Sequence, residues 1–225
     1  MNGRDPERVP YPESLRSSPV VAVLRAEHAR QYGPVIRALV DGGVTHIELT
    51  LSTAGVFEEL SALIAEFDGS AIIGLGTVTE AAEARRGIES GAAYLVTPAM
   101  HLEVVEAARE AGVPVFPGGF TPTELLQGWT AGASAVKLFP ATLAGSRYLA
   151  DLHGPFPEMR VMPSGGVTLE SAVPWLEAGA CAVSIGGPLL QDAFSGGELS
   201  ELRSRAASLS ADVASWLDAR GGDHD

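Results

Sequence analysis

The 225-residue sequence is poor in lysine and cysteine. Lys137 is its single lysine, while the other fourteen of its fifteen basic residues are arginines. Cys181 is its single cysteine, which excludes an internal disulfide and suits a cytoplasmic protein. The 28 acidic residues give a formal net charge of −13, which argues against nucleic acid and anionic membranes as partners. No apolar run reaches the roughly 18 residues needed to cross a bilayer.

Short apolar segments alternate with longer amphipathic segments along the chain. The apolar segments have the length and the valine-rich, isoleucine-rich composition of buried strands. They span residues 19–25, 46–51, 71–76, 92–97, 113–118, 134–139, 160–165 and 181–186. The amphipathic segments predict helices over 28–41, 54–67, 79–90, 101–111, 122–131, 146–152, 168–178 and 198–217.

Eight successive strand–helix units predict an α/β fold, namely a closed (β/α)8 TIM barrel. An open doubly wound sheet is the alternative, but it usually has fewer strands, and no Gly-x-Gly-x-x-Gly turn follows the first apolar segment. We expect a single barrel domain over residues 19–217. A leading segment over 1–18 would cover the barrel floor, and residues 218–225 would form a flexible tail.

Lys137 lies in the middle of the apolar segment SAVKLF. An ammonium ion buried there costs several kcal/mol unless it is paired or loses its proton. Lysine can become a neutral amine, whereas arginine keeps its charge in proteins. The alternative is a lysine whose stem packs in the core while its ammonium group reaches a carboxylate.

Glu48 and Thr50 alternate with Ile47 and Leu49 in the second apolar segment, which places the two polar residues on the inner face of a barrel. Barrel active sites lie at the carboxyl ends of the strands, so Glu48 and Lys137 are expected to share one cavity. A neutral Lys137 amine would attack a ketone and form an imine, while Glu48 moves protons. A structural salt bridge between the two is the alternative.

Other strand ends carry candidate ligand-binding residues. Arg25 ends the first apolar segment, and Gly76-Thr77 and Thr97-Pro98 end the third and fourth. Gly165-Gly166 and Gly186-Gly187 follow the seventh and eighth, where barrels commonly bind phosphate. A glycine pair alone often marks only a turn. No histidine pair has metal-ligand spacing, so we expect neither a metal nor another cofactor.

Nine short motifs occur in a fixed order: VAVLRA, GGVTHIELTL, GLGTVT, VTPAM, FPGGFTPTEL, VKLFPA, GPFP, PSGGV and SIGGPL. In this order the chain resembles the 2-keto-3-deoxy-6-phosphogluconate / 4-hydroxy-2-oxoglutarate aldolase family over about residues 19 to 217. The resemblance implies a homotrimer of barrels that uses a Schiff-base lysine and no metal. It also implies cleavage of a 2-keto-4-hydroxy acid to pyruvate and an aldehyde.

The family's motifs can be carried over residue by residue. The lysine of K-x-F-P falls on Lys137, the proton-shuttling glutamate of E-x-T on Glu48, and the threonine that contacts the pyruvate carboxylate on Thr77. We expect substrate contacts from Arg25, Thr50, Thr77, Pro98, Phe139 and Ser164. The glycines that hold the phosphate fall on Gly165, Gly166, Gly186 and Gly187.

Three departures from the family pattern concern the substrate end of the site. Ser52 stands where many members have an arginine near the substrate carboxylate, and Arg25 would supply that charge instead. Ala99 follows Pro98 where glycine or histidine is usual, and Ser164 replaces a common threonine. Gluconate-type, galactonate-type and unphosphorylated glutarate-type substrates therefore all stay open.

Two other functions fit the same residues. In a phosphosugar isomerase or epimerase, Lys137 would stay charged and stabilise an enolate. A non-catalytic sugar-phosphate-binding barrel would bind its ligand without turnover.

Overall fold

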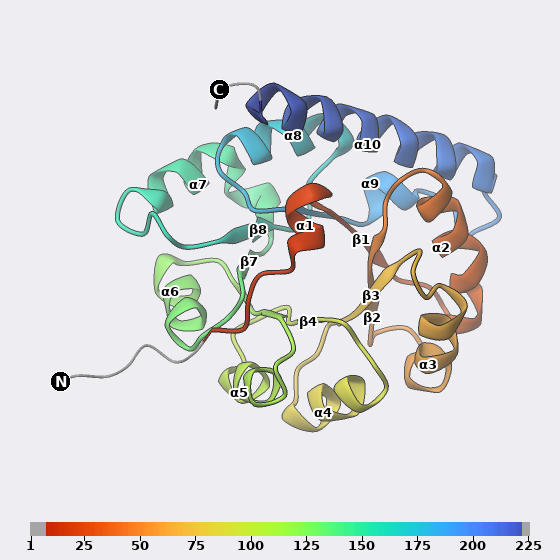
Figure 1. Cartoon of the computed structure of the whole chain (residues 1–225), viewed down its shortest axis with the longest axis horizontal. Helices are drawn as coiled ribbons and strands as arrows, with labels where there is room; N and C mark the ends of the chain where they lie inside the picture. The colour runs from red at the N-terminus through yellow and green to blue at the C-terminus, as the bar shows by residue number, and fades with distance from the viewer. Residues whose placement is uncertain (1–7, 222–225) are drawn as a thin grey trace.

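The computed structural model describes residues 8–221. Its strands form a six-stranded and a three-stranded sheet, both parallel. Helices pack around the outside of the strands (Figure 1). The predicted α/β fold with parallel strands is confirmed. No helix within residues 8–221 is both long and apolar enough to cross a membrane.

The six-stranded sheet has the order β5-β4-β3-β2-β1-β9. Its strands are β1 Val20–Leu24, β2 His46–Thr50, β3 Ile72–Gly76, β4 Leu95–Val96, β5 Val115–Phe116 and β9 Val183–Ile185. The three-stranded sheet consists of β6 Gly118–Gly119, β7 Val136–Leu138 and β8 Val161–Pro163. The single strand predicted over 113–118 is therefore wrong, because Pro117 has no N–H for a ladder and separates β5 from β6.

The two sheets meet through backbone contacts on either side of the three-stranded sheet. The Ser134 N–H donates to the Val115 carbonyl at 3.1 Å, next to β7 and β5. The Cys181 N–H donates to the Val161 carbonyl at 2.9 Å, and Ser164 and Ser184 form an isolated parallel bridge. Because every pairing is parallel, the carboxyl ends of the strands share one side of the molecule.

The outer helices are close to those predicted from the periodicity. They are α2 Tyr32–Asp41, α3 Val56–Glu66, α4 Ala81–Glu89, α5 Leu102–Glu110, α6 Pro122–Thr130, α7 Gly145–His153, α8 Leu169–Glu177 and α10 Leu199–Gly221. Capping boxes at Thr121 and Thr168 begin α6 and α8. Three short elements were not predicted as separate units: η1 Ala29–Gln31, η2 Ala141–Leu143 and α9 Gly187–Leu190.

The leading segment contains a short helix, α1 Glu13–Ser17, which lies over the middle of the strands in Figure 1. Tyr11 and Leu15 are buried in an inner apolar cluster that includes Tyr94 and Phe116. Ser14 Oγ lies 2.9 Å from Nε2 of His46, the first residue of β2. The segment thus covers the amino-terminal end of the strands. Residues 1–7 lie outside the described residues.

The last helix continues past the predicted end at residue 217, so residues 218–221 are helical and do not belong to a tail. Trp216 and Leu217 pack against the core. The Arg220 guanidinium lies 5.0 Å from the Trp216 ring centroid, an i, i+4 contact that extends the helix. Residues 222–225 lie outside the described residues.

The buried His46 makes the free energy of unfolding depend on pH. It is 1% exposed, and burial lowers its pKa from 6.5 to about 4. Between those values the unfolded chain binds the proton and the folded chain does not, so the free energy of unfolding falls as pH decreases. We expect wild type to lose about 2 to 3 kcal/mol more than His46→Gln between roughly pH 7 and pH 4.5. Urea unfolding at both pH values tests this, and equal losses would contradict it.

Candidate active site

A cavity of about 460 Å³ opens at the carboxyl ends of the strands. Every residue that the sequence assigned to catalysis, substrate contact or phosphate binding lines it: Lys137, Glu48, Arg25, Thr50, Thr77, Pro98, Phe139, Ser164, Gly165, Gly166, Gly186 and Gly187. The structure thus brings together residues from most of the strands. Their individual roles stay predictions.

Lys137 and Glu48 face each other inside this cavity. Lys137 Nζ lies 3.6 Å from Glu48 Oε1, and the two side chains are only 8% and 1% exposed. This ion pair is looser than the surface pair between Arg37 and Glu66, whose closest atoms are 2.7 Å apart. Lys137 Nζ also lies 5.6 Å from the ring centroid of Phe139. The lysine amine is therefore close to a carboxylate that can accept its proton, without being held in a short hydrogen bond.

Glycines on β3 make room for the Glu48 side chain. A side chain on Gly76 would collide with the carboxyl group of Glu48, and one on Gly74 would collide with the ring of Tyr94. Glu48 pairs with Gly74 in the β2–β3 register, so the glycine next to it leaves the inner face open. The Glu48 Oε2 atom is buried without a hydrogen-bond partner among the described residues. An unpartnered buried carboxylate oxygen is costly and is typical of a reactive group.

Hydroxyl groups fix the backbone beside Arg25. The Leu24 carbonyl accepts hydrogen bonds from the Thr50 hydroxyl at 3.0 Å and from the Tyr32 hydroxyl at 3.2 Å. Ser52 donates to Thr50 Oγ1 at 3.1 Å and does not line the cavity. Among the residues that line the cavity, Arg25 and Lys137 are the cations. Arg25, next to the fixed Leu24 carbonyl, therefore supplies a second positive charge for an anionic substrate.

Two further strand ends shape the cavity wall. Thr77 follows β3 with φ +59°, a conformation that is uncommon outside glycine and is often found at functional sites. Thr97 accepts a hydrogen bond from the Gly118 N–H at 3.0 Å and donates to the Ala99 carbonyl, and so holds the turn that contains Pro98. The first turn thus depends on an unusual backbone conformation, and the second on the Thr97 side-chain hydroxyl.

The glycine loops after β8 and β9 offer free backbone donors. Gly165 and Gly166 have φ values of +77° and +93°, and a side chain on Gly166 would collide with Thr142. Ser164, just before them, donates to Ser184 Oγ at 3.2 Å and so joins the end of β8 to β9. Within residues 8–221, no carbonyl group accepts the N–H of Gly165, Gly166 or Gly186. Clustered free N–H groups are suited to an anion such as phosphate.

The segment that follows α9 lines the cavity without having been predicted to do so. Gln191, Phe194 and Ser195 line the cavity, as do Val23, Pro188 and Leu190. Gln191 has φ +47°, and the Phe194 ring lies 5.8 Å from the Tyr32 ring centroid in an edge-on contact. No motif in the sequence marks this wall, because it is formed by tertiary packing of a loop.

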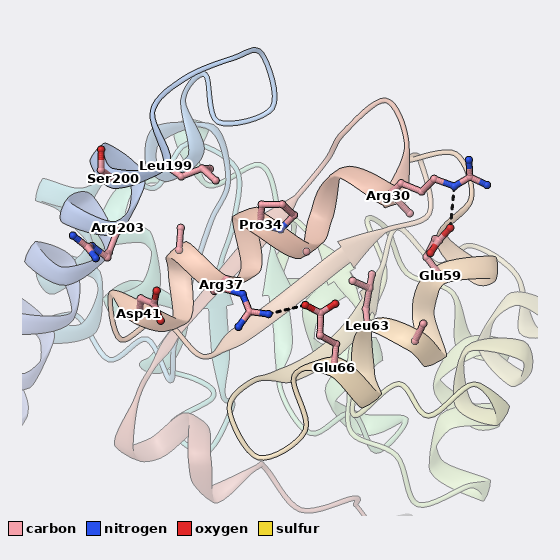
Figure 2. Close-up of a pocket in the computed structure, with 14 residues that line it drawn as sticks. Arg30, Pro34, Arg37, Asp41, Glu59, Leu63, Glu66, Leu199, Ser200 and Arg203 are labelled. Carbon is pink, nitrogen blue, oxygen red and sulfur yellow. Dashed lines mark hydrogen bonds and ion pairs between the residues drawn. The ribbon is translucent and has the colours of Figure 1, made fainter.

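A larger hollow lies outside the strands, between α2, α3 and the start of α10 (Figure 2). Its volume is about 650 Å³, but it contains no lysine, and four of its charged side chains form two ion pairs at the surface. Arg37 pairs with Glu66 at 2.7 Å and Arg30 with Glu59 at 3.2 Å, as the dashed lines of Figure 2 show. We assign the active site to the smaller cavity, since it contains the buried amine and carboxylate.

The part of the chain that the structure describes contains no group of three or more histidine, cysteine, aspartate or glutamate side chains that could hold a metal ion. The chemical groups of the cavity are therefore an amine, a carboxylate, a guanidinium, hydroxyls and backbone N–H groups. A buried amine beside a buried carboxylate in a cavity suits imine chemistry on a ketone.

Comparison with known proteins defines the class of this protein as an aldolase, a carbon–carbon lyase. The family model described as KDPG and KHG aldolase matches residues 12–202, and the chain belongs to this family.

Relatives with two different substrates in their names are similar to the chain. It is 34% identical to the 2-dehydro-3-deoxy-phosphogluconate aldolase of Dickeya dadantii, over 84% of the chain and 87% of that protein. It is 31% identical to the 2-dehydro-3-deoxy-6-phosphogalactonate aldolase of Escherichia coli, over 76% and 84%. The KDPG aldolase of Legionella pneumophila, solved with pyruvate captured as a covalent carbinolamine intermediate, has a TM-score of 0.80 at 26% identity, over 87% and 96%.

Proposed function

We propose that the chain is a class I aldolase that cleaves 2-keto-3-deoxy-6-phosphogluconate, or a close 2-keto-4-hydroxy acid, to pyruvate and an aldehyde. The reaction passes through a Schiff base on Lys137. The observation that carries this proposal is the pairing of the buried Lys137 amine with the Glu48 carboxylate, 3.6 Å away in the cavity. The carbinolamine seen with pyruvate in the Legionella pneumophila relative supports covalent chemistry of this kind.

The proposed reaction needs one nucleophile and one proton carrier. With its proton on Glu48, the Lys137 amine attacks the C2 ketone, and loss of water from the carbinolamine gives an iminium ion. Glu48 gives its proton to the departing water and is then ionised. It accepts the proton of the C4 hydroxyl as the iminium withdraws the electrons of the C3–C4 bond, which releases the aldehyde and leaves an enamine. Glu48 delivers a proton to C3, and one water then hydrolyses the imine to free pyruvate and the amine.

The remaining residues bind the two anionic ends of the substrate. Arg25, at the end of β1, attracts the keto-acid carboxylate, in the place of the arginine that Ser52 replaces. Thr77 donates to the same carboxylate. Thr50, Pro98, Phe139 and Ser164 form the walls, and Gly165, Gly166, Gly186 and Gly187 receive the phosphate with their N–H groups. The lining positions of these residues support this assignment.

Replacing Arg25 with methionine is expected to raise KM for pyruvate by about 10- to 100-fold with a smaller change in kcat, because a charge-assisted hydrogen bond contributes about 1.5 to 3 kcal/mol. Steady-state kinetics of the reverse, aldol-forming reaction measure this. Arg30→Met is the matched control, since Arg30 pairs with Glu59 in the outer hollow. An unchanged KM in Arg25→Met would remove Arg25 from the carboxylate site.

The configuration at C4 of the substrate is to be determined by experiment. Relatives named for gluconate-type and for galactonate-type substrates are about equally similar to the chain. Pyruvate release should be compared for the two phosphorylated epimers and for 4-hydroxy-2-oxoglutarate. We expect the phosphorylated substrates to have the higher kcat/KM, because the free N–H groups of the two glycine loops match a phosphate. A preference for 4-hydroxy-2-oxoglutarate would assign those loops another role.

We also propose the higher-order features that the resemblance implies. The contacts on either side of the three-stranded sheet support a closed (β/α)8 barrel that forms a single domain. The exposed side chains of Leu102 and Leu143 support burial in a homotrimer, which sedimentation equilibrium would test. The single cysteine and the metabolic relatives support a cytoplasmic location.

A further inference from the structure

Tyr94 lies in the same row of the sheet as Glu48. Glu48 on β2 pairs with Gly74 on β3, and Leu75 pairs with Leu95, so Gly74 is opposite Tyr94. Adjacent strands are about 4.8 Å apart, which puts Tyr94 two strand spacings from Glu48 with only a glycine between them. The inner face of this row is therefore shared by a carboxylate and a phenol.

The two side chains lean over neighbouring glycines of β3. The Tyr94 ring fills the space that a side chain on Gly74 would need, and the ring carbon nearest to its hydroxyl is among the closest atoms. The Glu48 carboxyl fills the space that a side chain on Gly76 would need. These two glycines are two residues apart on β3 and so lie on the same face, which places the Tyr94 ring and the Glu48 carboxyl over successive inner-face positions of one strand.

Both side chains end in polar atoms that the described protein leaves unpartnered. The Tyr94 hydroxyl and Glu48 Oε2 are sealed from solvent and have no hydrogen-bond partner within residues 8–221. Tyr94 is 0% exposed and Glu48 is 1% exposed. Burial raises the pKa of Tyr94 well above its ordinary value, and the nearby negative charge of Glu48 raises it further. The phenol thus keeps its proton and is a hydrogen-bond donor, while Oε2 is an acceptor.

We propose that Tyr94 is a positioning residue for Glu48, whose Oε2 receives a hydrogen bond from the Tyr94 hydroxyl through one buried water molecule. The inference rests on the proposed role of Glu48 as the proton carrier. The hydrogen bond holds the carboxylate toward Lys137 and stabilises its ionised form, which is the form that removes a proton from C3 of the pyruvate imine. It thereby sets the pH range in which the proton transfer operates.

Other titratable or charged groups around Glu48 could also shift the pH range of the proton transfer. They are Lys137 on β7, Arg25 at the end of β1, Tyr94 before β4 and, on β2 itself, His46. Burial lowers the pKa of His46 to about 4, so it stays neutral in an assay above pH 5 or so. A change in Tyr94 alone therefore reports on its hydrogen bond to Glu48.

The test is the pH profile of hydrogen–deuterium exchange at the pyruvate methyl group, measured by NMR for wild type and Tyr94→Phe. Loss of a hydrogen bond to the ionised carboxylate is expected to move the acidic limb of the profile upward by about one pH unit. Along that acidic limb the exchange rate of Tyr94→Phe should fall by up to about tenfold, and the same change in a Glu48→Gln background should have no effect.

The matched control is Tyr11→Phe. Tyr11 belongs to the same inner cluster and lies 6.2 Å from the Phe116 ring centroid, but its hydroxyl donates to the Cys181 carbonyl at 2.9 Å. Its profile should match that of wild type. A Tyr94→Phe profile that superimposes on wild type, or an equal shift in Tyr11→Phe, would overturn the inference while leaving the aldolase proposal intact. Wild type that exchanges no methyl protons and is not trapped by borohydride with pyruvate would overturn both.

Discussion

Lys137→Arg is expected to lose pyruvate release by at least about 10⁴-fold, with no adduct formed from pyruvate and borohydride. The guanidinium keeps its charge and cannot form an imine with a ketone. Stopped assays of pyruvate release and mass spectrometry of the borohydride-treated protein measure the two effects. Lys137→Met, which removes the nitrogen and keeps an unbranched side chain, should give the same result.

The matched control for this prediction is Arg37→Lys, the reverse exchange at an exposed ion pair of the outer hollow. It should retain wild-type activity, and circular dichroism should show that all variants fold. Activity within about tenfold of wild type in Lys137→Arg would contradict imine formation at this residue. Such a result would favour a cleavage mechanism without an imine, in which a permanent positive charge stabilises an enolate.

Glu48→Gln is expected to slow proton exchange at the pyruvate methyl group by about 10²- to 10⁴-fold, because the amide cannot carry the proton. Borohydride should still trap pyruvate on Lys137 during a long incubation, although more slowly, since water can accept the Lys137 proton when the Glu48 carboxylate is absent. Glu48→Gln is expected to affect exchange far more than trapping, because exchange requires proton transfer to and from C3, whereas trapping requires only the imine. NMR of the methyl group and mass spectrometry of the adduct measure the two steps on the same sample.

Glu66→Gln on α3 is the matched control for Glu48→Gln, since its carboxylate pairs with Arg37 far from the cavity. It should leave both steps unchanged. If Glu48→Gln exchanges methyl protons at the wild-type rate, another group carries the proton and the role proposed for Glu48 is wrong. If it loses trapping as well, Glu48 acts at the stage at which Lys137 gives up its proton.

Most of the sheet could be predicted from the sequence, because strands buried on both faces appear as continuous apolar runs. Every apolar segment contains a strand, and the segment over 134–139 contains β7 with Lys137 at its centre. The division at Pro117 was not predicted, although its cause is local: a residue without an N–H cannot continue the ladder. The end of α10 was predicted too early because its last turn depends on Arg220 and Trp216.

The contents of the cavity could be predicted because parallel pairing places the carboxyl ends of the strands side by side. Alternation located Glu48, isolation among apolar residues located Lys137, and glycine pairs located the two loops that lie at the cavity. The wall formed by Gln191 and Phe194 could not be predicted, since it depends on how α9 returns the chain across the cavity. The alignment of Tyr94 with Glu48 could not be predicted either, because it follows from the register of β2, β3 and β4.

Incubation of the wild-type protein with pyruvate and sodium borohydride, followed by peptide mass spectrometry, tests imine formation most directly. We predict a single reduced-pyruvate adduct on the peptide that contains Lys137, since it is the sole lysine of the chain. A folded protein that stays unmodified at saturating pyruvate would contradict the mechanism.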